Sequence, residues 1–112
     1  EFVLKLSKKL NGKNYELAVK NLMNNNNKAL LSLWNDMGKV DNRNIALMVD
    51  KRVLYISGND SQFYREEAGK MISSMFKKGE FASVQGGHLL LLENPVEVNR
   101  VIEEFLIQIY TP

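Results

Sequence analysis

The 112-residue sequence contains no cysteine, and none of its apolar runs approaches the roughly 20 residues of a membrane-spanning helix. Without cysteine, disulfides, thiolate nucleophiles and cysteine-based zinc sites are excluded. The opening residues also lack the layout of a secretory signal peptide. We therefore expect a soluble, cytoplasmic protein whose chemistry depends on oxygen and nitrogen groups and which has no membrane partner.

Charge is nearly balanced, with 15 Lys and Arg against 13 Asp and Glu. The basic residues are scattered, apart from the pairs Lys8-Lys9 and Lys77-Lys78, whereas phosphate binding needs a concentrated patch. The single histidine and the scattered carboxylates show no metal-ligand spacing. We expect no nucleic-acid partner, no metal and no cofactor.

Two short amphipathic helices are predicted in the first part of the chain. A helix over about 13–24 ends at the run Asn24-Asn25-Asn26-Asn27, because asparagine favours caps and turns. A second helix ends near Gly38, a residue suited to the left-handed C-terminal cap. The apolar stripes that define them are Tyr15, Ala18, Val19, Leu22 and Met23, then Leu30, Leu33, Trp34 and Met37.

The pattern changes after residue 51 to that of a strand, a helix and a second strand. The run Val53–Ile56 is β-branched and aromatic, and it predicts a buried parallel strand over about 52–57. Apolar residues at helical spacing then predict a helix over about 62–77 that stops at Gly79. A second strand over about 81–85 completes a right-handed crossover, so the two strands should be parallel neighbours.

The end of the chain predicts a helix over about 95–109. Asn94 is a good N-cap, Pro95 suits the first helical position, and Glu97 can reach back to the cap. The apolar residues after it repeat at helical spacing, which is typical of a core-facing helix.

Asp60 and His88 are the candidate catalytic residues, because each follows one of the two predicted strands. Ligands of open parallel sheets bind beyond the carboxyl ends of the strands, where these side chains can meet. Asp60 would orient the imidazole of His88, and His88 would take a proton from a hydroxyl nucleophile. Gly86 and Gly87 before His88 would let the loop turn sharply and approach other backbone closely.

A non-catalytic interpretation stays open from the residues alone. A histidine in a glycine-containing loop is often structural, and an aspartate after a strand is a common turn residue. In that case the chain is a small α/β binding or scaffolding module.

Residues 43–109 resemble the C-terminal portion of the α/β-hydrolase fold. The segments Arg52–Asp60 and Phe81–His88 look like its last two core strands with their acid and histidine loops, and Leu92-Glu93-Asn94-Pro95 is similar to the stretch that commonly follows. The resemblance implies an α/β fold, with residues 1–42 as a cap or lid and 43–112 as part of the core. It also implies that Asp60 and His88 act in hydrolysis of an ester, thioester or related acyl bond of a small-molecule substrate.

Two departures from this family shape the expectation. Many members place the acid three residues after the glycine that ends the strand, where this chain has Ser61 rather than Asp60. No Gly-x-Ser-x-Gly nucleophile motif occurs anywhere in the sequence. Two parallel strands also make an incomplete sheet. We therefore interpret the chain as a C-terminal fragment, inactive alone, whose sheet is completed by a missing N-terminal segment or by self-association.

Overall fold

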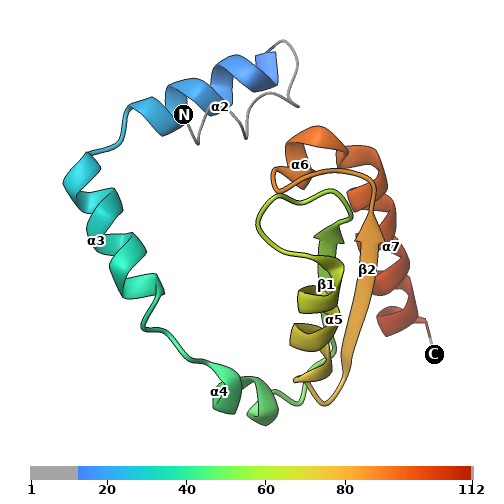
Figure 1. Cartoon of the computed structure of the whole chain (residues 1–112). Coiled ribbons are helices and arrows are strands. Elements are labelled where there is room, and N and C mark those ends of the chain that lie inside the picture. Colours follow the sequence, from blue (N-terminus) through green and yellow to red (C-terminus); the bar gives the residue numbers. More distant parts are fainter. Residues whose placement is uncertain (1–12, 112) are drawn as a thin grey trace. The chain divides into compact units, whose positions relative to one another are not determined.

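A computed structural model describes residues 13–111, except for the side chains of residues 13–15, 18 and 22 (Figure 1). The elements follow one another in this order: α2 (Lys13–Met23), α3 (Asn27–Met37), α4 (Arg43–Met48), β1 (Val53–Gly58), α5 (Glu66–Ser74), β2 (Gly79–Val84), α6 (Leu90–Glu93) and α7 (Pro95–Tyr110). The chain divides into two compact units, Glu1–Asn44 and Ile45–Pro112, which are considered separately.

The first unit contains the two predicted helices, α2 and α3, and the asparagine run separates them as expected. Asn26 is the N-cap of α3, where its Oδ1 accepts hydrogen bonds from the N–H groups of Lys28 and Ala29. Gly38 ends the helix as predicted, but in a right-handed conformation with φ −66° and ψ −14° rather than the expected left-handed one, because its N–H still bonds to the Trp34 carbonyl. The predicted stripe of α3 is between 42% and 64% exposed at Leu30, Leu33, Trp34 and Met37. Of the predicted stripe of α2, the side chains of Tyr15, Ala18 and Leu22 lie outside the described residues.

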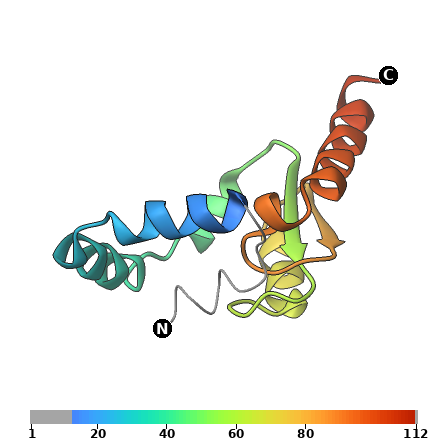
Figure 2. The ribbon, with the colours of Figure 1, turned by 90° about the horizontal axis from the view of Figure 1, so that it is seen from above.

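The second unit has a mixed α/β architecture in which β1 and β2 are parallel and joined by α5, as predicted. The register pairs Val53 with Gly79 and Gly58 with Val84. Helix α5 lies on one side of the strands and α7 on the other (Figures 1 and 2). Among the described residues the sheet has only these two strands, so it is incomplete.

The two faces of the strands contact different helices. On one face a Cβ added to Gly69 of α5 would lie 2.7 Å from the Phe81 ring and 2.8 Å from the Tyr55 ring, so the absence of a side chain there lets α5 pack closely. On the other face Arg52 lies 5.1 Å from the ring of Phe105 in α7. Val84 and Val98 form the small buried core, at 4% and 2% exposure.

Strand β1 is only half-buried over Val53–Ile56, whereas the sequence predicted a buried strand. Val53 donates its N–H to Lys78, and Asn59 donates its N–H to Val84. Because backbone groups alternate along a strand, the N–H and C=O groups of Leu54, Ile56 and Gly58 point toward the opposite edge. The sheet has no second neighbour for β1 among residues 13–111, so no strand covers that edge and β1 is only half-buried there.

Helix α5 is shorter than the predicted helix over 62–77. Ser61 Oγ accepts hydrogen bonds from the N–H groups of Phe63 and Tyr64, both at 3.4 Å, which holds these residues in a turn before Glu66. At the other end Gly79 is the first residue of β2 rather than a helix stop. A Cβ at Gly79 would lie 1.8 Å from the carbonyl oxygen of Ser73, so only glycine fits this tight connection.

Helix α7 agrees closely with its prediction. Asn94 caps it by accepting the N–H of Glu97, and Pro95 occupies its first turn. The Glu97 side chain does not act as predicted, because it pairs with Arg100 at 3.0 Å instead of reaching back to the cap. Helices α4 and α6 were not predicted, since neither is long enough to show a helical repeat.

Candidate functional site

Asp60 and His88 lie in the loops that follow β1 and β2. Because the strands are parallel, both loops leave the same end of the sheet (Figure 1). Both residues are exposed, so solutes can reach them. The arrangement has the topology that the sequence predicted for a site at the carboxyl ends of two neighbouring strands.

Four hydrogen bonds join the two loops. Asn59 donates its N–H to the Val84 carbonyl at 2.9 Å, which continues the ladder of the sheet past the end of the strands. Asp60 donates its N–H to the Gly86 carbonyl, also at 2.9 Å. The Asn59 side chain accepts the N–H of Gly86 at 3.2 Å and donates to the Gln85 side chain at 3.1 Å. The backbones that carry Asp60 and His88 are thus fixed to each other.

Glycines permit this close approach. A Cβ at Gly58 would lie 2.4 Å and 2.5 Å from the carbonyl oxygens of Gly87 and Gly86, closer than side chains pack. Gly86 has a φ of +149°, a region that other residues rarely adopt. The close backbone contact expected at the glycines before His88 is present, and it also depends on Gly58.

Two aromatic side chains from the loop after β1 lie next to His88. The imidazole centroid lies 4.4 Å from that of Phe63, with the rings tilted by 54°, and 6.3 Å from that of Tyr64. His88 therefore packs against the same loop that carries Asp60. Sequence reasoning missed Phe63 and Tyr64 because it placed both in a helix, and only the turn at Ser61 brings them toward His88.

The other side of the His88 loop contacts the junction of α6 and α7. Glu93 Oε2 accepts the N–H of Gly87 at 2.8 Å. Asn94 Nδ2 donates to the Gln85 carbonyl at 2.9 Å, while its Oδ1 caps α7. The cap residue of the last helix thus also holds the histidine loop.

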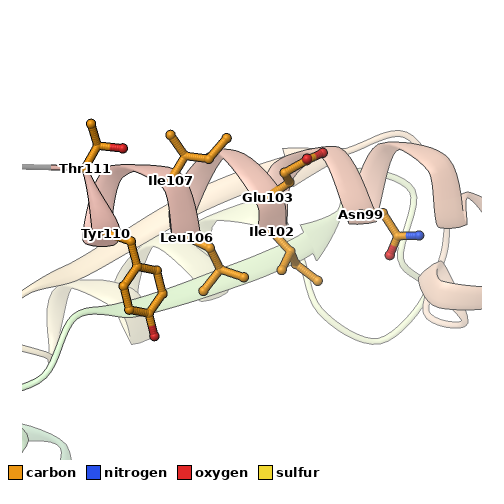
Figure 3. Close-up of a pocket in the computed structure, with 7 residues that line it drawn as sticks. All are labelled: Asn99, Ile102, Glu103, Leu106, Ile107, Tyr110 and Thr111. Atoms are coloured by element: carbon orange, nitrogen blue, oxygen red, sulfur yellow. The ribbon is translucent and has the colours of Figure 1, made fainter.

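Two hollows flank the candidate pair. Asp60 borders one of about 470 Å³, and its walls are mostly polar: Asn59, Asp60, Ser61, Tyr64, Arg65, Glu66 and Glu67. His88 borders another of about 630 Å³ with apolar walls, formed by Leu54, Ile56, His88, Leu89, Leu90, Leu91, Leu92, Val98 and Ile102. A third, of about 460 Å³, is lined by residues of α7 and by Thr111, and it shares only Ile102 with the second (Figure 3).

The clearest electrostatic effect lies outside these loops, at the start of α4. The Asp41 carboxylate accepts a hydrogen bond from the Arg43 guanidinium at 2.5 Å and one from the Arg43 backbone N–H at 3.1 Å. These two hydrogen bonds lower the pKa of Asp41 from 3.8 to about 2, and the one from the side chain has the larger effect. On α7, hydrogen bonds to Glu97 and Glu104 raise the pKa of Arg100.

Metal binding has no candidate site in the described part of the chain, where no three histidine, aspartate or glutamate side chains converge. Of the helices between residues 13 and 111, none has the length and apolar character to cross a bilayer.

Comparison with protein-family models, with curated proteins and with solved structures finds no match to this chain.

Proposed function

We propose that residues 43–109 are the C-terminal part of an α/β-hydrolase fold and that Asp60 and His88 serve acyl-bond hydrolysis. The observation that carries the proposal is the hydrogen-bonded pair of loops at the carboxyl ends of β1 and β2. An acid and a base must be held at a fixed separation to act on one proton, and backbone hydrogen bonds between their loops provide this.

In this proposal the Asp60 carboxylate accepts a hydrogen bond from the Nδ1–H of His88 and stabilises the imidazolium cation, without itself becoming protonated. His88 Nε2 takes the proton of a serine hydroxyl as its oxygen attacks the acyl carbon of an ester or thioester. The same proton then passes to the leaving alcohol or thiol. Water, activated again by His88, hydrolyses the acyl-serine and restores the serine hydroxyl.

The nucleophile is proposed to come from outside residues 1–112. The sequence has no Gly-x-Ser-x-Gly motif, and several of its serines already serve local structure. Ser73 and Ser74 donate to carbonyls one turn back in α5, and Ser83 donates to Glu66. Each of these three hydroxyls already donates its hydrogen bond to a carbonyl or carboxylate of the fold, and not to the imidazole that would activate a nucleophile.

The incomplete sheet supports a missing segment. Parallel sheets occur almost only with both faces covered and with several strands, yet β1 has its second edge open among residues 13–111. We propose that a preceding segment of the same protein supplies further strands along β1 together with the serine. Residues 1–42 would then belong to a cap or lid over the site.

The test expresses residues 1–112 together with any protein segment that is encoded directly before them, and it measures hydrolysis of p-nitrophenyl acyl esters. We expect that sequence to contain a Gly-x-Ser-x-Gly motif and the joined protein to turn over ester. His88→Ala should lower kcat by about 10³-fold or more, as removal of a triad member does elsewhere. The 112-residue chain alone should show no turnover.

Asp60→Asn and Glu67→Gln form a matched pair, since both side chains border the same polar hollow. Only Asp60→Asn should reduce kcat, because Glu67 has no part in the proposed proton transfer. Turnover that survives His88→Ala, or a preceding sequence without a serine motif, would refute the proposal. The chain would then be better interpreted as a binding or scaffolding module.

A further inference from the structure

Glu93 reaches back from the end of α6 to the backbone of the His88 loop. Its Oε2 accepts the N–H of Gly87 at 2.8 Å. A Cβ at Gly87 would lie 2.9 Å from Oε2 and 3.0 Å from Oε1, so the carboxylate packs directly on this peptide. Gly87 is buried, and Glu93 therefore replaces water as the hydrogen-bond partner of its N–H.

The loop is held on its opposite side as well. The carbonyl oxygens of Gly86 and Gly87 face Gly58, with no room for a side chain between them. The Gly86 carbonyl accepts the N–H of Asp60. The Gly86-Gly87 dipeptide before His88 is thus held between the end of β1 on one side and the Glu93 carboxylate on the other.

The geometry points to Glu93 as a positioning residue for His88. Its carboxylate fixes the Gly86-Gly87 backbone, and this fixes where the His88 side chain leaves the chain. A charged acceptor makes a stronger hydrogen bond than a neutral one, so Glu93 is suited to hold a glycine dipeptide that has little intrinsic rigidity. The role in catalysis rests on the proposed function, whereas the positioning itself does not.

His88 needs such support because its own side chain is exposed. The nearer of its two aromatic neighbours is the Phe63 ring, whose centroid lies 4.4 Å from that of the imidazole. A shift of the Gly87 peptide would move His88 relative to both Phe63 and the Asp60 loop. Misplacement of a catalytic group by about 1 Å can cost on the order of 100-fold in rate.

The first test measures amide hydrogen exchange by NMR in the 112-residue chain. In Glu93→Ala the Gly87 amide should exchange about 10- to 100-fold faster, the range expected for a lost hydrogen bond to a charged group. In Glu93→Gln a neutral oxygen still accepts the N–H with a weaker hydrogen bond, so exchange should rise by a smaller but measurable factor, about two- to tenfold. The Asn59 amide, which belongs to the sheet ladder, should not change in either variant.

Glu104→Ala is the matched control, since it removes the same side chain from an exposed site that pairs with Arg100. It should leave the Gly87 amide unchanged. The nuclear Overhauser effects between the Phe63 and His88 rings should weaken in Glu93→Ala and recover in Glu93→Gln. A residue needed only for stability would instead accelerate exchange at Asn59 as well and leave the ring contact in the folded state intact.

The second test uses the extended protein and the ester assay. Glu93→Ala should lower kcat by about 10- to 100-fold with KM nearly unchanged, and Glu93→Gln should restore most of kcat. Unchanged Gly87 exchange in both variants would overturn the inference, and Glu93→Gln alone decides this if Glu93→Ala does not fold. Unchanged kcat in an active, His88-dependent enzyme would overturn it too. If no form shows His88-dependent turnover, the proposed function fails, while the exchange and ring-contact results still support Glu93 as the residue that holds His88.

Discussion

Replacing Gly58 with alanine tests the contact between the two loops of the candidate site. The new methyl group would meet the Gly87 and Gly86 carbonyl oxygens at 2.4 Å and 2.5 Å, where real Cβ contacts lie beyond 3.0 Å. Gly58 does not have a positive φ, so the cost comes from this contact and not from the backbone conformation. The His88 loop must therefore move away from the end of β1.

The size of the effect follows from three contributions. Overpacking of a well-packed site costs about 1–3 kcal/mol. Loss of the hydrogen bond from Asp60 N–H to the Gly86 carbonyl adds about 0.5–1.5 kcal/mol. The lower entropy of the unfolded alanine chain offsets about 0.4–1 kcal/mol. We expect a net loss of about 2 kcal/mol, which corresponds to roughly a 30-fold change in the unfolding equilibrium.

The assay is hydrogen exchange at the Asn59 and Asp60 amides, combined with urea unfolding followed by circular dichroism. Gly38→Ala is the control, because a Cβ there would make only an ordinary contact at 3.6 Å and its backbone is already helical. It should be neutral or stabilising by less than about 1 kcal/mol. Wild-type stability and wild-type Asp60 exchange in Gly58→Ala would refute the proposed contact between the loops.

Two further predictions concern charged side chains. Hydrogen bonds from Arg43 lower the pKa of Asp41 from its ordinary value of 3.8 to about 2 in the folded chain. The pair therefore stabilises α4 fully above pH 3.8, and this stabilisation is lost as the pH falls through about 2. Carboxyl NMR titration should show the Asp41 pKa return toward 3.8 in Arg43→Ala, and an unchanged value would contradict the assignment. Arg52 links the strands to α7 through Glu80 and the ring of Phe105, and its side chain is 31% exposed, so Arg52→Ala should cost about 1–2 kcal/mol in urea unfolding. Arg52→Met keeps the apolar stem and should lose less, and equal losses in the two variants would show that packing of the stem contributes nothing and that the loss comes from the charge.

Local patterns predicted the β-α-β unit and the last helix. The Val53–Ile56 run, the spacing of apolar residues before Gly79 and the sequence Asn94-Pro95 each reflect interactions with near neighbours in the chain. Such patterns can be interpreted without knowledge of the tertiary structure. For this reason β1, β2 and α7 lie within a few residues of their predicted bounds.

Features that depend on contacts between distant residues could not be predicted in the same way. The start of α5 is set by the Ser61 turn, which competes with a helical pattern that continues through Phe63. Helix α6 has four residues and shows no periodicity, yet it returns Glu93 to the His88 loop. Strand β1 is only half-buried because it has one neighbouring strand in the described part of the chain, and no local pattern shows how many neighbours a strand will have.

The placement of the candidate site could be predicted in part. That Asp60 and His88 follow parallel strands comes from the order of elements, and the glycines before His88 indicate a close backbone contact. The contacts around His88 could not be predicted from the sequence, because Phe63 packs on its ring and Glu93 binds the backbone of its loop from different parts of the chain. Glu93 directly precedes Asn94-Pro95 at the start of the last helix, but this position indicates a contact with the His88 loop only once the fold is known.

The most direct test of the central proposal is the tautomeric state of neutral His88, measured by ¹⁵N NMR in the 112-residue chain. If Asp60 orients His88, the proton should reside mainly on Nδ1, leaving Nε2 free to take the proton of a hydroxyl nucleophile. Asp60→Asn should shift the balance toward the Nε2 tautomer, while Glu67→Gln should not. A wild-type His88 protonated mainly on Nε2, with no response to Asp60→Asn, would contradict the assignment of these two residues as acid and base.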